Sequence, residues 1–278
     1  MNKKAVSLLK ALCVFVIFAG CFLGLSRLTK LFAWPTDTLR SVVFRLLIMA
    51  ILVVTAAVLH MLGIFRFTWK SFRHGCVVGL FFVIYIVFQF VTGFFSAFKT
   101  GGALIPVSEI ILHILDIVIG VGFIEEVMFR GIILNLIADG FGRDKKSSFM
   151  IAILISSVLF GFMHFGNLLT AGSQFSGVLV QVISTIGTGT MLGAIYVRCG
   201  NIWLMSLLHG LYDFALFVPS LWQTSQTNMA EDISSYSFNP VTIAVFVIEV
   251  MVFLFLMRKK RSGDYLHTAC SNKQEEKQ

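Results

Sequence analysis

Charged residues are scarce in this sequence. Asp, Glu, Lys and Arg make up only 13% of its 278 residues, whereas 57% are hydrophobic and 14% are aromatic. Soluble domains carry about 25% charged residues. The composition therefore excludes an ordinary soluble globular protein and favours an integral membrane protein.

Familiar metal-binding and processing patterns are also absent. The five cysteines show no CxxC spacing, which favours buried structural thiols, and neither HExxH nor HxxEH occurs. The apolar stretch 12–25 follows three lysines in the manner of a signal peptide, but no A-x-A-like cleavage site comes after it. We therefore expect an uncleaved first helix.

The net charge of +8 comes from basic residues that lie at the ends of apolar segments. They cluster around residues 3–10, 66–73, 143–146 and 258–261. Such clusters mark cytoplasmic loops, whereas the 219–239 loop has two acidic residues and no basic one. The basic residues of 27–45 disagree, because they flank the first outward connection. The pattern as a whole predicts a multi-pass protein of the cell membrane with both termini cytoplasmic. The partner that this pattern predicts is the lipid bilayer, not a nucleic acid.

Apolar stretches close to 20 residues long predict about eight membrane-spanning helices, and seven with a re-entrant piece stay open. The stretches are 8–25, 41–63, 76–98, 104–124, 148–165, 176–197, 202–218 and 240–257. Gly120 and Gly122 predict a bend, with 123–139 as a separate helical piece. The predicted fold is thus an all-α polytopic membrane bundle.

We divide this bundle into four regions. About three N-terminal helices occupy 1–103, and the candidate catalytic core occupies 104–218. An extracytoplasmic loop and the last span follow in 219–257, and a basic then polar cytoplasmic tail in 258–278.

Three charged residues interrupt one of the apolar stretches: Glu125, Glu126 and Arg130. An ionised group costs several kcal/mol in hydrocarbon unless it faces protein or water and finds a partner. Glu126 and Arg130 are four residues apart, which suits an ion pair on one helical face. Glu125 points about 100° away and is left for chemistry in the bundle interior. The alternative is that both carboxylates brace the one arginine.

Two further stretches place histidines in apolar helices. His164 ends the run that begins at Phe160, and His209 lies four residues before Asp213 on one helical face. A carboxylate so placed can fix the tautomer of an imidazole. The simpler alternatives are an interfacial histidine and a pair that only braces its helix.

One carboxylate and two histidines can hydrolyse an amide without a serine or cysteine nucleophile. The carboxylate takes a proton from water, a histidine shares that task or donates to the leaving amine, and polar groups stabilise the oxyanion. The alternative is that Glu125, His164 and His209 hold zinc, which acidifies the water. We predict no cofactor, with zinc as the alternative.

In order along the chain, Glu125–Arg130, Phe160–His164 and His209–Asp213 match the motifs EExxxR, FxxxH and HxxxN or HxxxD. Over about 120–215 the sequence resembles the CAAX protease and bacteriocin-processing family of intramembrane endopeptidases, also called the Abi family. The resemblance implies a bundle of eight helices with a conical cavity open to the cytoplasm.

The resemblance also implies roles for the motif residues. Glu125 and His164 would activate the attacking water, and His209 with Asp213 would form the oxyanion-binding side. Asp213 stands where CAAX-processing members have asparagine, and an ionised aspartate cannot donate to an oxyanion. We therefore expect it to be protonated or to orient His209. The supporting residues are Glu126, Arg130 and Phe160.

The sequence leaves two other functions open beside an endopeptidase. One is a non-catalytic membrane immunity or interaction protein of the same family, in which the polar groups are braces. The other is a small proton-coupled transporter. Its path would use Glu109, His113, Asp116 and Glu249.

Overall fold

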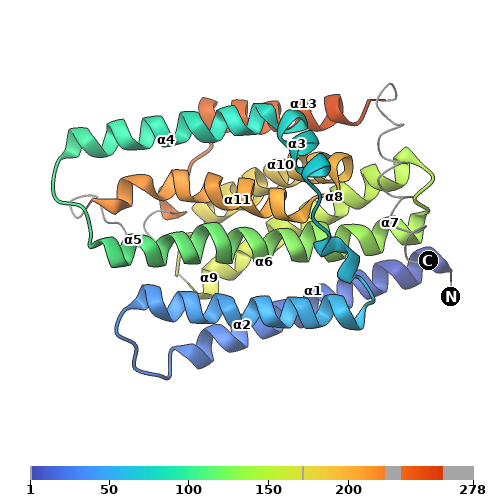
Figure 1. The fold of residues 1–278 in the computed structure, drawn as a ribbon, viewed down its shortest axis with the longest axis horizontal. Helices are drawn as coiled ribbons and strands as arrows, with labels where there is room; N and C mark the ends of the chain where they lie inside the picture. Colours follow the sequence, from blue (N-terminus) through green and yellow to red (C-terminus); the bar gives the residue numbers. More distant parts are fainter. Residues whose placement is uncertain (1, 171, 223–232, 259–278) are drawn as a thin grey trace.

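The computed structural model describes residues 2–170, 172–222 and 233–258. Its regular elements there are helices that lie side by side along one common direction (Figure 1). This confirms the predicted all-α polytopic bundle. Glu231, Asp232 and the predicted tail beyond residue 258 lie outside the described residues.

In the described part of the chain, seven helices are long and apolar enough to cross a membrane. They are α1 (Lys3–Thr29), α2 (Asp37–Val58), α4 (Leu80–Thr100), the run Val107–Phe141, α8 (Lys146–Met163) with its extension to Leu169, α10 (Phe175–Cys199), and α11 (Ile202–Phe217) with its extension to Leu221. An eighth apolar helix, α13 (Pro240–Leu256), has 17 residues. At ~1.5 Å per residue it is ~26 Å long, a little less than the hydrocarbon core.

The predicted break at Gly120 and Gly122 is wrong. Helical structure continues from Val107 to Phe141 without interruption. It consists of α5 (Val107–His113), a π segment (Ile114–Val121), α6 (Gly122–Glu126), a second π segment (Val127–Leu134) and α7 (Asn135–Phe141).

The glycines in this run serve close packing. A side chain at Gly122 would collide with the carbonyl oxygen of Ser206 and lie 2.8 Å from the backbone nitrogen of Gly210. Small residues let two membrane helices bring their backbones together. Gly122 therefore allows α6 to lie directly against α11.

We expect Gly122→Ala to lower the free energy of unfolding by about 1–3 kcal/mol, because overpacking a close contact costs that much. The matched control is Gly20→Ala in α1, where an added side chain meets nothing within 4 Å. Thermal unfolding of both variants in the same detergent checks this. Equal melting temperatures would contradict the close approach of α6 and α11.

Helix α10 lies at the centre, between α8 and α13. A side chain at Gly189 would lie 2.9 Å from the Cβ of Ser157 on α8. On the other side, a side chain at Gly187 would lie 2.6 Å from a carboxylate oxygen of Glu249 on α13. The two glycines thus let α10 contact a helix on either face.

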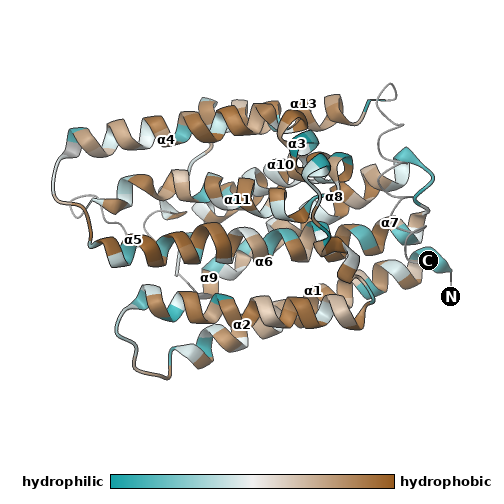
Figure 2. Cartoon of the chain, in the orientation of Figure 1, coloured by the Kyte–Doolittle hydropathy of each residue, from teal (hydrophilic) through white to brown (hydrophobic). Residues whose placement is uncertain are grey.

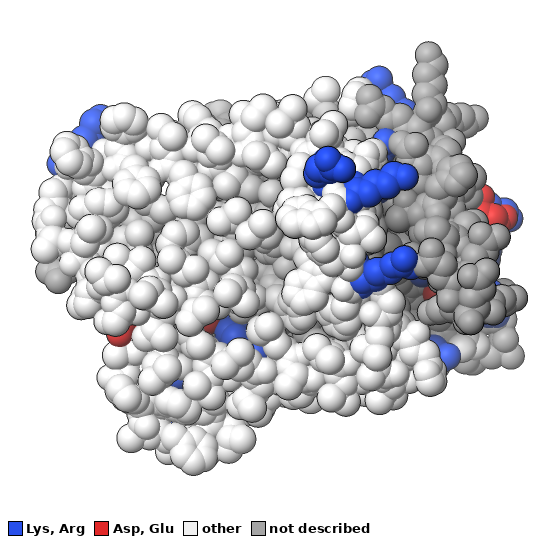
Figure 3. Space-filling model, in the orientation of Figure 1, with Lys and Arg blue, Asp and Glu red and all other residues white. Residues whose placement is uncertain are grey.

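The basic clusters of the described chain gather at one end of the bundle. Lys4, near the start of α1, lies 5.3 Å above the ring of Phe141 at the end of α7. At the end of α10, Arg198 donates to the carbonyl of Leu256 in α13, at 3.2 Å. Figure 3 shows most Lys and Arg of this face towards the end where α3 and α7 lie and a few elsewhere, and Figure 2 shows hydrophobic helices away from that end.

The structure adds one helix that the sequence did not predict. Helix α3 (Trp69–Val78) follows the short 3₁₀ turn Leu62–Phe65 and meets α4 at Gly79. The predicted span 76–98 therefore begins inside α3, and its spanning part is α4.

Candidate active site

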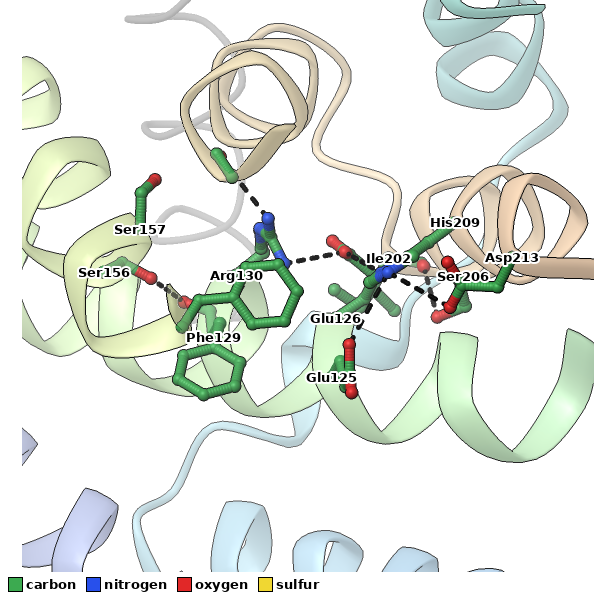
Figure 4. A network of polar contacts seen from close by, with 12 residues as sticks. Glu125, Glu126, Phe129, Arg130, Ser156, Ser157, Ile202, Ser206, His209 and Asp213 are labelled. Atoms are coloured by element: carbon green, nitrogen blue, oxygen red, sulfur yellow. Dashed lines mark hydrogen bonds and ion pairs between the residues drawn. The ribbon is translucent and has the colours of Figure 1, made fainter. Parts of the chain in front are cut away.

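The centre of the site is a fully buried carboxylate, Glu126. One of its oxygens, Oε1, accepts from Nη1 of Arg130 at 2.8 Å and from Nδ1 of His209 at 2.7 Å (Figure 4). The first contact confirms the ion pair predicted from the four-residue spacing. The second contact joins residues 83 positions apart, which helical spacing does not predict.

Arg130 has partners on three sides. Besides Glu126, its Nη2 donates to the carbonyl of Gly189 at 3.4 Å. Its Cζ atom lies 4.5 Å from the centre of the Phe160 ring, within the range of a cation–π interaction. The guanidinium is only 1% exposed, so these contacts replace its water. Phe160 and Gly189 thus both contact the guanidinium of Arg130, and the supporting role of Phe160 stays a prediction.

The other nitrogen of His209 faces two carboxylates. Nε2 lies 3.5 Å from Oε2 of Glu125 and 3.5 Å from Oδ2 of Asp213 (Figure 4). Both distances are longer than a good hydrogen bond. The three side chains therefore lie close together without direct hydrogen bonds through Nε2 of His209. The side chains of Glu125 and Asp213 are 25% and 29% exposed, whereas His209 is 5% exposed. The two carboxylates therefore form the open side of the cluster.

The structure supports the predicted separation of the two adjacent glutamates. Glu126 is wholly buried and holds Arg130 and His209, while Glu125 reaches the partly exposed side. The predicted pairing of His209 with Asp213 on one helical face is also present.

His164 lies at the end of α8, in the 3₁₀ turn His164–Gly166. Its Nδ1 donates to the carbonyl of Phe160 at 3.0 Å, which leaves Nε2 as the acceptor in the neutral ring. The Phe160 ring contacts both imidazoles, with ring centres 5.3 Å from His164 and 5.7 Å from His209. The two histidines thus pack against the same aromatic ring. A water shared by Glu125 and His164 stays a prediction.

A metal site was the alternative for these residues. Among the described residues, no group of three or more His, Cys, Asp or Glu side chains is arranged to hold a metal ion. Glu125, His164 and His209 therefore do not form a ready ligand set in this conformation.

The residues of the proposed transport path have separate partners. Asp116 accepts from Nε of Arg45 at 3.2 Å, which joins the long helix to α2. The ring of His113 lies 4.4 Å from that of Phe217. Glu249 is on the far side of α10, where its Oε1 accepts from the Thr188 hydroxyl at 2.7 Å.

Residues 106–215 match the family model described as type II CAAX prenyl endopeptidase Rce1-like. This segment is Rce1-like. The match confirms the family resemblance and includes all three motifs, from Glu125 to Asp213. No match was found among curated proteins or among solved structures.

The Rce1-like segment coincides with the long helix, α8, α10 and most of α11, which carry the polar cluster. Helices α1 to α4 and α13 lie outside it. The chain is therefore a multi-pass membrane protein whose central segment is similar to CAAX-type intramembrane proteases.

Proposed function

We propose that the protein is an intramembrane endopeptidase that hydrolyses a peptide bond of a peptide or a membrane-tethered protein by activating water. One observation carries the proposal. His209 has Nδ1 held by the buried Glu126, while its Nε2 faces the partly exposed Glu125 and Asp213. An imidazole fixed on one side and open on the other is suited to acid–base catalysis.

In the proposed reaction, Glu125 takes a proton from water and the water oxygen forms a bond to the carbonyl carbon of the substrate. The neutral ring of His164 can accept from the same water through Nε2, since Nδ1 donates to Phe160. The C–N bond then breaks as Glu125 passes its proton to the leaving amine.

His209 provides the positive charge for the developing oxyanion in this scheme. A protonated imidazole donates through Nδ1 to Glu126 and through Nε2 to the oxyanion. Asp213 does not donate to the oxyanion, and instead its Oδ2, 3.5 Å from Nε2, stabilises the imidazolium. This gives the aspartate a role where CAAX-processing relatives have asparagine.

We propose a metal-free reaction, in which Glu125 and His164 activate the water directly. We further propose that the basic end of the bundle is cytoplasmic, as the positive-inside rule predicts. The protein then lies in the cell membrane with the start of α1 and the end of α13 inside.

The test is peptide cleavage by purified protein in lipid vesicles, read by mass spectrometry. We expect His209→Ala to lower kcat/KM by about 10²- to 10³-fold, the usual cost of losing an oxyanion donor. The matched control is His113→Ala, because His113 is a half-buried histidine in contact with Phe217 and outside the cluster. It should keep wild-type activity.

Three results would count against this proposal. Absence of cleavage by the wild type would favour the non-catalytic immunity or interaction protein. Full activity of His209→Ala would remove the oxyanion role. Loss of cleavage with a chelator, restored by zinc, would replace the metal-free reaction by the zinc alternative.

A further inference from the structure

Helix α3 has an inner face that is anchored to the protein. The hydroxyl of Ser71 accepts from Nδ2 of Asn201 at 2.9 Å, at the turn between α10 and α11. Gly75 is buried, and a side chain there would lie 3.0 Å from the Cβ of Cys199 and would collide with Leu204. The inner face is therefore fixed against the Rce1-like segment.

The outward face of α3 joins large apolar side chains to positive charge. Trp69 is 68% exposed and Val77 is 73% exposed. Between them, Lys70, Arg73 and His74 are also exposed. Residues 60–79 contain no Asp or Glu, so no acidic neighbour in this segment neutralises the charge.

Aromatic rings extend this surface towards the preceding turn. Phe67, Trp69 and Phe72 form a cluster in which each pair of ring centres is 5.2–5.8 Å apart. Trp beside Lys and Arg is typical of the boundary between hydrocarbon and lipid headgroups. The arrangement therefore suits an interfacial position and not bulk water.

The position of α3 in the bundle agrees with this. Gly79 joins it directly to α4, whose first residues Leu80 and Phe81 are 54% and 44% exposed. The apolar outward surface thus continues from Val77 onto a membrane-spanning helix. Figure 3 shows basic side chains over α3 and the segment before it.

We propose that the outward face of α3 binds the headgroup of an anionic phospholipid. Its phosphate accepts from Lys70 and Arg73, which are three residues apart and share one helical face. Its acyl chains run along Val77 and Leu80 into the bilayer. An acidic protein would leave these apolar side chains uncovered, so the combined charge and hydrophobicity favour a lipid.

Quenching of tryptophan fluorescence by brominated lipids tests the proposal in the full-length protein. The signal of Trp69 is the difference between the wild type and Trp69→Phe. In vesicles, brominated phosphatidylglycerol should quench this signal more than brominated phosphatidylcholine at equal mole fraction. A basic side chain near an anionic surface contributes about 1 kcal/mol, a factor of about five, so Lys70→Gln and Arg73→Gln should each reduce the preference about fivefold.

The matched control is Lys99→Gln. Lys99 is an exposed lysine at the other end of α4, away from α3. It should leave the preference unchanged. Equal quenching by the two lipids in the wild type, or a preference that survives in the double variant Lys70→Gln/Arg73→Gln, would overturn the proposal. An equal loss in Lys99→Gln would also overturn it, since only net charge would then matter.

Discussion

Replacing Glu125 with glutamine is expected to lower kcat/KM for peptide cleavage by about 10²- to 10⁴-fold, the usual contribution of a general acid or base. An amide keeps the size of the side chain and can still approach Nε2 of His209, but it cannot take a proton from water. Because the side chain is 25% exposed, the substitution should not disturb packing. A loss of activity in this variant would therefore report a loss of catalysis and not a loss of folding.

The measurement is cleavage of the same peptide by wild type and variant, with melting temperatures recorded in parallel. Glu109→Gln is the matched control, since Glu109 is a partly exposed carboxylate at the other end of the same helical run. Its activity should equal that of the wild type. A Glu125→Gln protein that melts normally and retains more than half of its activity would rule out Glu125 as the group that takes the proton.

The parts of this site that lie on one helix could be predicted from spacing. Glu126 and Arg130, and likewise His209 and Asp213, are four residues apart, and helical geometry alone brings each pair together. The same geometry turns Glu125 away from Glu126. For these residues the sequence is sufficient because the local structure is helical and the environment is apolar.

Contacts between helices could not be predicted in this way. The approach of Glu126 to His209 depends on how closely α6 packs against α11, and Gly122 allows that approach. The same glycine was interpreted as a bend, because propensity describes a glycine's backbone freedom and not the helix that fills the space beside it.

The position of His164 has a similar explanation. The position of His164 along α8 predicts how deep it lies in the membrane, but it does not predict which side chains lie beside it. The ring of Phe160 supplies the connection, since it contacts His164, His209 and Arg130 at once. The FxxxH motif contains this phenylalanine, but only the packed structure explains why a large aromatic ring is needed there.

The second large effect concerns Arg130. We expect Arg130→Leu to lower the free energy of unfolding by about 3–5 kcal/mol, because it leaves the carboxylate of Glu126 buried without its charged partner. The ion pair is 1% and 0% exposed, so water cannot compensate. Chemical unfolding in detergent measures the loss. A loss of less than 1 kcal/mol in the free energy of unfolding would show that Glu126 is not an ionised carboxylate that depends on Arg130.

The double variant Glu126→Leu/Arg130→Leu separates stability from function. Replacing both members of a buried ion pair by apolar residues is often neutral or stabilising, so most of the lost stability should return. Cleavage should not return, because Nδ1 of His209 loses the acceptor that lies 2.7 Å away. In the described structure, Oε2 of Glu126 is buried without a hydrogen-bond partner. An unpaired buried oxygen lowers stability, and an ion pair that served stability alone would not need to include one. A double variant that is both stable and active would reduce the Glu126–Arg130 pair to a brace and would remove Glu126 from the positioning of His209.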